Sequence, residues 1–180
     1  EEIKKLMANR SAATAKPEFP SSPVGDPGRR EERLQGQGGM AVPRQYEDKK
    51  QSTRVSKPGE SKTWLKNLYT NFDDQMVCQI CKDKMPFKKR NGEYYFEAKE
   101  IFIREMLSGE KKEYFLALCP NCSAMYTEFV IHEKNAMESL KQDILQSQNQ
   151  LEFNINLGKI ENSIRFVESH IFDLRTHLNQ

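Results

Sequence analysis

Regular spacing of hydrophobic residues is confined to the last two thirds of the chain. Before residue 60, proline and glycine recur too often for a long helix or strand, and the run RREERLQGQ carries charge without an apolar face. Short exceptions are expected, a helix in EEIKKLMANR and an edge strand from Tyr46 to Ser56. We therefore expect residues 1–60 to be a linker or long irregular arm, largely disordered alone, that lies across a partner surface.

The sequence of residues 61–136 predicts short helices and strands arranged around the cysteines. Ser61 is the expected N-cap of a helix over KTWLKNLYT, which is too short to be stable unless it packs on the cysteine segment. Its apolar stripe consists of Trp64, Leu65 and Leu68. Two strands are expected, in YYFEAKEIF and in YFLAL, and the dipeptide Asn91-Gly92 predicts a chain reversal before them. Pro120 marks the start of a second helix. The inward face of that helix is expected to be Ala124, Met125, Phe129 and Val130.

The sequence of residues 137–180 predicts a helix, a β-hairpin and a final helix. The run LEFNINLGK alternates with a period of two, as a strand with one buried face does, and Gly158 and Lys159 supply the turn. The partner strand is expected at Ile164–Val167, and the flanking helices in MESLKQDILQ and SHIFDLRTHL. Because so small a unit buries little surface by itself, we expect it to dock on the cysteine segment or on a larger protein.

The four cysteines form two C-x2-C pairs, Cys78 with Cys81 and Cys119 with Cys122. Thiolates two residues apart bind one metal ion from a single turn, and two such turns complete the tetrahedral sulfur site that zinc prefers. We therefore predict one structural Zn2+ bound by all four residues, with backbone amides of the turns donating to the thiolates. Disulfides, a redox dithiol and an iron–sulfur cluster are the alternatives that the sequence leaves open.

Composition narrows the class of protein. Only 37% of the 180 residues are hydrophobic and the mean hydropathy is −0.80, which is low for a chain that is globular throughout. The formal charge of +2 includes no polybasic tail, which argues against a protein that binds nucleic acid by charge alone. No apolar run reaches the roughly 18 to 20 residues that cross a bilayer, so we expect no membrane contact and a cytoplasmic location. Because the chain starts at Glu1, we expect a fragment of a longer protein.

The order C-x2-C, YFEA and LALCPNC in the central segment resembles the zinc-bound form of the HNH nuclease family. The resemblance implies an α+β fold with a small treble-clef zinc finger, in which a knuckle and a β-hairpin precede a helix that carries the last ligand in its first turn. The N-terminal arm and the C-terminal hairpin-plus-helix segment lie outside it. In that family a histidine pair after YFE, an asparagine before the second cysteine pair and a histidine after the last cysteine carry the chemistry.

These functional positions hold other residues in this chain. Lys99 and Glu100 stand at the histidine pair, Tyr114 lies near the asparagine position and Ser123 follows the last cysteine. A lysine is protonated near neutral pH and cannot accept a proton as imidazole does, and serine is a weak ligand for a hard cation. We therefore expect no enzymatic activity. The histidines are expected at the surface or at helix caps, and they are His132, His170 and His177.

The runs CQIC, MPF, YYFEA and LALCPNC are also similar to cysteine modules near the C-termini of large bacterial proteins. These proteins have a sacsin-like or histidine-kinase-like ATPase region, and some are linked to phage defence. The similarity implies that the chain is the tail of such a protein and that its ATP site lies elsewhere. The glycines at 36, 38 and 39 fit this expectation, because no lysine follows them as in a phosphate-binding loop.

Three functions are therefore hypotheses from the sequence. The first is a non-catalytic zinc module that docks domains or subunits of a larger assembly, with bacterial defence as one setting. The second is a nucleic-acid-binding zinc finger in which Phe87 offers a stacking face. Its basic loop consists of Lys82, Lys84, Lys88, Lys89 and Arg90. The third is a divergent HNH-like nuclease that uses Glu97 or Glu100.

Overall fold

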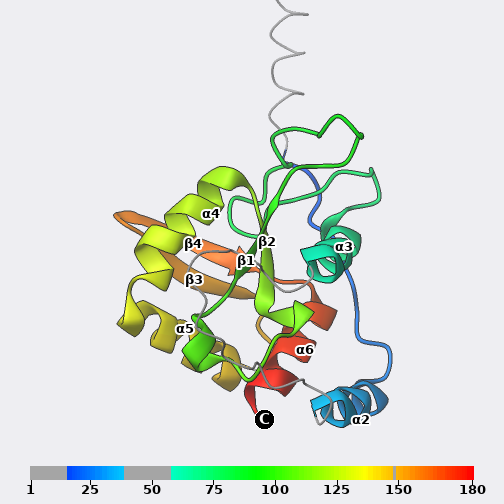
Figure 1. The fold of residues 1–180 in the computed structure, drawn as a ribbon, viewed down its shortest axis with the longest axis vertical. Coiled ribbons are helices and arrows are strands. Elements are labelled where there is room, and N and C mark those ends of the chain that lie inside the picture. The colour runs from blue at the N-terminus through cyan, green and yellow to red at the C-terminus, as the bar shows by residue number, and fades with distance from the viewer. Residues whose placement is uncertain (1–15, 39–57, 148) are drawn as a thin grey trace, which may run out of the picture.

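The structure is a computed structural model that describes residues 16–38, 58–147 and 149–180. These residues form five α-helices and two separate two-stranded antiparallel sheets, so the predicted α+β class is confirmed (Figure 1). The helices are α2 (Pro27–Gly38), α3 (Pro58–Tyr69), α4 (Pro120–Tyr126), α5 (Lys134–Gln146) and α6 (Glu168–Leu178). The strands are β1 (Glu97–Glu100), β2 (Phe115–Leu118), β3 (Glu152–Leu157) and β4 (Ile160–Arg165). The helix expected in residues 1–10 and the strand expected at Tyr46–Ser56 lie outside the described residues. None of the described helices is long and apolar enough to span a bilayer.

The first sheet, β1 with β2, lies at the centre of the molecule and leads directly into the second cysteine pair. Glu97 of β1 pairs with Leu118 of β2, so the inner strand ends one residue before Cys119. Residues 116–118 are buried, and α3 and α4 both pack against β2 (Figure 1). The predicted reversal at Asn91-Gly92 is confirmed, because Gly92 has a φ of +82° and its amide donates to the Lys89 carbonyl.

The second sheet, β3 with β4, packs on α5 and on the segment after α4. The predicted alternation in β3 is confirmed, since its three buried residues are Phe153, Ile155 and Leu157. The partner strand begins at Ile160 and not at Ile164, because the two-residue turn with Gly158 at a φ of +69° pairs Leu157 directly with Ile160.

Two helix predictions need correction. Helix α3 begins at Pro58 and not at Ser61, because proline is favoured in the first turn of a helix, where its missing N–H costs nothing. The predicted domain boundary at residue 60 therefore falls inside α3.

Helix α4 does begin at Pro120, but its buried face differs from the predicted one. Ala124 and Phe129 are exposed, whereas Tyr126 is buried and donates its hydroxyl to the Ile101 carbonyl at 2.6 Å.

The described part of the N-terminal arm, residues 16–38, contains a helix that the sequence did not predict. Helix α2 begins at Pro27, and the Asp26 carboxylate accepts a hydrogen bond from the Arg29 amide at 3.1 Å, which caps the helix. Leu34 is buried, and α2 packs against α6 (Figure 1). Charge dominates the α2 sequence, so its stability depends on this tertiary contact and not on an apolar stripe.

Residues 16–22 of the arm cross from the first cysteine pair to the start of α6. The Lys16 ammonium donates to the Cys81 carbonyl at 3.0 Å, and the Phe19 ring packs edge-on against Tyr69 at 5.9 Å. Farther along, the Ser22 carbonyl accepts from the Ser169 amide at 2.9 Å. These residues of the arm therefore lie across a surface of the same chain, whereas the sequence analysis expected a partner surface.

His170 and His177 are buried on α6, which contradicts their expected place at the surface. The Tyr69 hydroxyl lies 2.7 Å from Nδ1 of His170, and the Glu113 carbonyl lies 3.0 Å from Nε2. Because a carbonyl only accepts, Nε2 carries a proton. Burial lowers the pKa of His170 to about 4, so the ring is neutral near pH 7 and Nδ1 accepts from the Tyr69 hydroxyl. His132 is exposed, as predicted.

This burial predicts a loss of stability in mild acid. The unfolded chain protonates His170 below its ordinary pKa of 6.5, whereas the folded chain does so only near 4, so stability is complete above 6.5 and falls as the pH drops. Between about pH 7.5 and about pH 5.5 we expect His170 to account for a loss of about 1.4 kcal/mol in the free energy of unfolding. Urea unfolding at each pH measures it. A His170→Gln variant should lose that part of the pH dependence, whereas His132→Gln should keep all of it.

Candidate metal centre

The first cysteine pair lies in a tight turn that follows α3. The Cys78 amide donates to the Asp83 carbonyl at 3.0 Å, and the Lys82 amide donates to the Cys78 carbonyl at 3.0 Å, which folds the chain back on itself. Lys82 closes this turn with a φ of +60°, a conformation that costs a non-glycine residue energy. Its side chain offsets this cost by bonding to the C-terminal hairpin, where the Ser163 carbonyl accepts from it at 2.9 Å.

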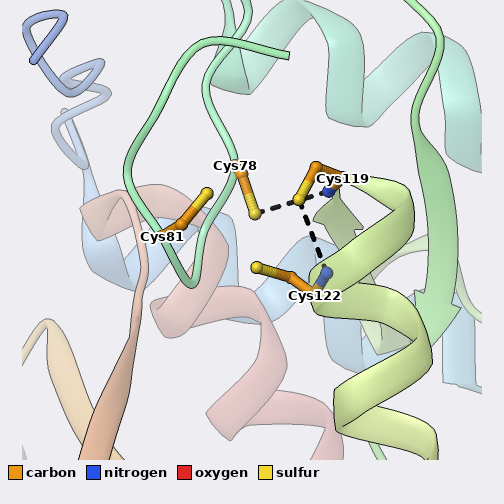
Figure 2. A group of neighbouring side chains, drawn as sticks. All are labelled: Cys78, Cys81, Cys119 and Cys122. Carbon is orange, nitrogen blue, oxygen red and sulfur yellow. Dashed lines mark hydrogen bonds between the residues drawn. The ribbon is translucent and has the colours of Figure 1, made fainter. Parts of the chain in front are cut away.

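The second pair is placed by the start of α4. Cys119 is the N-cap of the helix, Pro120 fixes the first turn, and Cys122 lies within that turn. The Ser123 amide donates to the Cys119 carbonyl at 2.9 Å and so closes the first helical bond. The spacing of the two cysteines therefore points both sulfur atoms out of the same end of the helix (Figure 2).

The structure brings all four predicted ligands together. Their Sγ atoms lie within 4.8 Å of one another and point toward a common centre between the turn and α4 (Figure 2). Four sulfur atoms around zinc at about 2.3 Å lie about 3.8 Å apart, so this donor set fits a tetrahedral metal ion after small movements. The thiols are free, with no disulfide among them. The arrangement is compatible with a metal site in its donor atoms and in its geometry.

Backbone amides support the sulfur atoms, as predicted. The Cys119 amide donates to Sγ of Cys78 at 3.4 Å, and the Cys122 amide donates to Sγ of Cys119 at 3.5 Å (Figure 2). Hydrogen bonds from Cys122 and Cys78 lower the pKa of the Cys119 thiol. Metals bind thiolates and not thiols, so a lowered pKa of Cys119 favours the form that can bind a metal.

Gln79, between the first two cysteines, connects the site to both sheets, and the sequence analysis missed it. Its side-chain oxygen accepts from the Ala117 amide at 2.7 Å, and its side-chain nitrogen donates to the Arg165 carbonyl at 3.1 Å. Its main chain bonds to the same two residues. The Gln79 amide donates to the Ala117 carbonyl, and the Gln79 carbonyl accepts from the Arg165 amide. A polar residue inside a C-x2-C turn is no signal by itself, so only the fold reveals this role.

In the structure, the basic residues of the loop that was proposed to bind nucleic acid have different partners and do not all face the same way. Lys82 turns away from it toward β3 and β4, and its ammonium lies 3.0 Å from the Glu152 carboxylate. Lys89 pairs with Glu93 at 3.0 Å, and Lys88 lies over the Tyr94 ring at 4.6 Å. The remaining two residues are exposed, and they are Lys84 and Arg90. Nucleic-acid binding by this loop stays a prediction.

Of the four residues that the sequence analysis compared with HNH catalytic residues, Tyr114 and Ser123 are buried. Tyr114 is buried and its hydroxyl lies 3.2 Å from that of Ser108, while Ser123 is buried and its carbonyl accepts from the Thr127 hydroxyl at 2.8 Å. Lys99 and Glu100 lie on β1.

Comparison with known proteins identifies no relative. No protein family matches the chain, and neither a curated protein nor a solved structure is significantly similar to it. The HNH-like and ATPase-tail resemblances therefore stay predictions, and the function must be argued from the site itself.

Proposed function

We propose that the chain is a structural zinc module that docks within a larger protein or assembly and performs no reaction. One observation carries this proposal, the convergence of four Sγ atoms from two distant turns to within 4.8 Å. All-sulfur tetrahedral sites are typical of structural zinc, in which no coordination position is left for water or substrate. The order of turn, β1–β2 hairpin and α4 supports a zinc finger of the treble-clef type.

Bound zinc would hold the first turn against α4 and supply on the order of 10 kcal/mol of folding free energy. The chain's own residues extend this link to the rest of the fold. Gln79 ties the first turn to β2 and β4, and Lys16 ties it to the N-terminal arm. The metal site is therefore the point at which the arm, both sheets and α4 meet.

Docking is supported by large aromatic side chains that the fold leaves exposed. Phe72 is 95% exposed and contributes nothing to the core of the described residues, and Phe87 is 51% exposed. Both flank the first cysteine turn in sequence. Large aromatic side chains of this kind are enriched at protein interfaces.

Removal and return of the metal test the zinc proposal. We expect the purified chain to contain one zinc ion, to lose its tertiary structure in a chelator and to regain it when zinc is added. Metal analysis together with near-UV circular dichroism measures this. A chain that stays folded without metal, or a mass that reveals disulfides between the cysteines, would contradict the proposal.

A further inference from the structure

Two exposed aromatic residues lie at one end of the molecule. Phe72 lies in the turn between α3 and the first cysteine pair, and Phe87 lies in the loop that follows that pair. The two segments are joined, because the Met85 amide donates to the Met76 carbonyl at 2.8 Å. Both loops project from the upper end of the molecule in Figure 1. Single exposed hydrophobic residues are common on protein surfaces, but these two are held in place by hydrogen bonds and ring contacts of their own segments.

Phe72 is presented by a rigid turn, residues 71–75, which we call the plug turn. The Asn71 side-chain oxygen accepts from the amides of Asp73 at 3.1 Å and Gln75 at 2.9 Å. The Asn71 side-chain nitrogen donates to the Glu18 carbonyl of the arm at 3.0 Å. A turn that is fixed by its own hydrogen bonds holds Phe72 outward before any partner arrives, which lowers the entropy cost of binding.

Phe87 stacks on Tyr95, and we call this stacked pair the aromatic platform. The two rings stack with centroids 5.0 Å apart and planes 10° apart. The Tyr95 amide donates to the Phe87 carbonyl at 3.0 Å, and its hydroxyl donates to Glu97 at 2.8 Å, so the platform is also fixed. Another aromatic ring packs favourably on such a surface.

The charges around these two features have opposite signs. Asp73 and Asp74 follow Phe72 in the plug turn and are exposed. Lys88 and Arg90 follow Phe87 and are also exposed. The plug turn of one copy can therefore contact the aromatic platform of a second copy, which carries the opposite charge. A two-fold axis between the copies forms this contact twice, once in each direction.

We propose that two copies of the chain associate through this end, with Phe72 of each copy packed on the Phe87–Tyr95 platform of the other. Asp73 of each copy then faces Arg90 of the other. This inference rests on the proposed docking function and names its surface and its partner, a second copy of the chain.

Sedimentation velocity of the metal-loaded full chain over a concentration series tests the proposal. We expect a reversible equilibrium between monomer and dimer, with a dissociation constant that Phe72→Ser raises by about tenfold or more. Phe72→Ser should fold normally, because the side chain touches no core residue. Ile160→Ser is the matched control, since Ile160 is also exposed, at 56%, but lies on the β3–β4 hairpin. That variant should dimerise as the natural chain does.

A charge exchange tests the orientation of the two copies. Asp73→Lys and Arg90→Glu should each weaken the dimer, because each places like charges in contact across the interface. The two substitutions in one chain should restore it, since the pair is then re-formed with its signs reversed. Failure of the double variant to recover would overturn the proposed pairing.

The remaining outcomes separate this inference from the zinc proposal. A folded, zinc-loaded chain that stays monomeric at every concentration overturns the dimer and leaves the zinc module intact. A dimer that Phe72→Ser leaves unchanged also overturns it. A monomer that binds a labelled single-stranded DNA oligonucleotide through Phe72 assigns this end to nucleic acid instead. A chain that binds no zinc and nevertheless folds and dimerises refutes the zinc proposal and leaves the dimer intact.

Discussion

Cys119→Ser is expected to abolish metal binding and to remove the cooperative unfolding transition of the zinc module. Serine is a poor zinc ligand, so three sulfur atoms would remain around an incomplete site, and the metal-dependent stabilisation, on the order of 10 kcal/mol, would be lost. The effect should extend beyond the site, because the first turn also anchors β2 and β4 through Gln79. Metal content and thermal unfolding followed by circular dichroism measure both consequences.

Asn121→Ala is the matched control for this substitution. Asn121 lies between the two ligands of the second pair but is exposed. Its replacement should leave one zinc ion per chain and the melting temperature nearly unchanged. A Cys119→Ser chain that keeps its zinc and its melting temperature would show that the four sulfur atoms do not act as one site.

Arg30→Ala is expected to lower the free energy of unfolding by about 3 kcal/mol. The Arg30 guanidinium donates two hydrogen bonds to the Asp173 carboxylate, at 2.5 and 2.6 Å, and Asp173 is buried on α6. The same contact raises the pKa of Arg30. Without Arg30 the carboxylate would stay buried with its main partner removed, which costs more than the pair contributes. Urea unfolding at neutral pH measures the difference.

Two further variants show whether the buried charge is the cause. Arg29→Ala removes the neighbouring, exposed arginine of α2 and should change stability by less than about 0.5 kcal/mol. Arg30→Met combined with Asp173→Leu replaces both charges by apolar groups and should recover most of the lost stability. If the double variant were as unstable as Arg30→Ala, lost packing of α2 on α6 would explain the result better.

Local sequence patterns correctly predicted the elements whose formation depends on neighbouring residues. The period of two in residues 153–157, the turn at Asn91-Gly92 and the helix start at Pro120 each depend on neighbouring residues, and all three are present. Helix α2 has a local start signal in Asp26 and Pro27 but no apolar stripe, because its stability depends on α6 at the other end of the chain. The buried face of α4 was wrong for a related reason. Cys122 must face the cysteine cluster, so Tyr126, one turn later, turns inward with it.

The sequence by itself determined which donor atoms a metal site would have, because two C-x2-C pairs supply four sulfur atoms, which suit metals that prefer thiolates. Only the tertiary structure decided which other residues hold the fold around them. Gln79 within the first turn, Lys82 turned toward Glu152 and His170 enclosed beneath Tyr69 all meet partners far along the chain. Hydrogen bonds between distant segments leave no periodic trace in a sequence, since they depend on where the backbone brings each group.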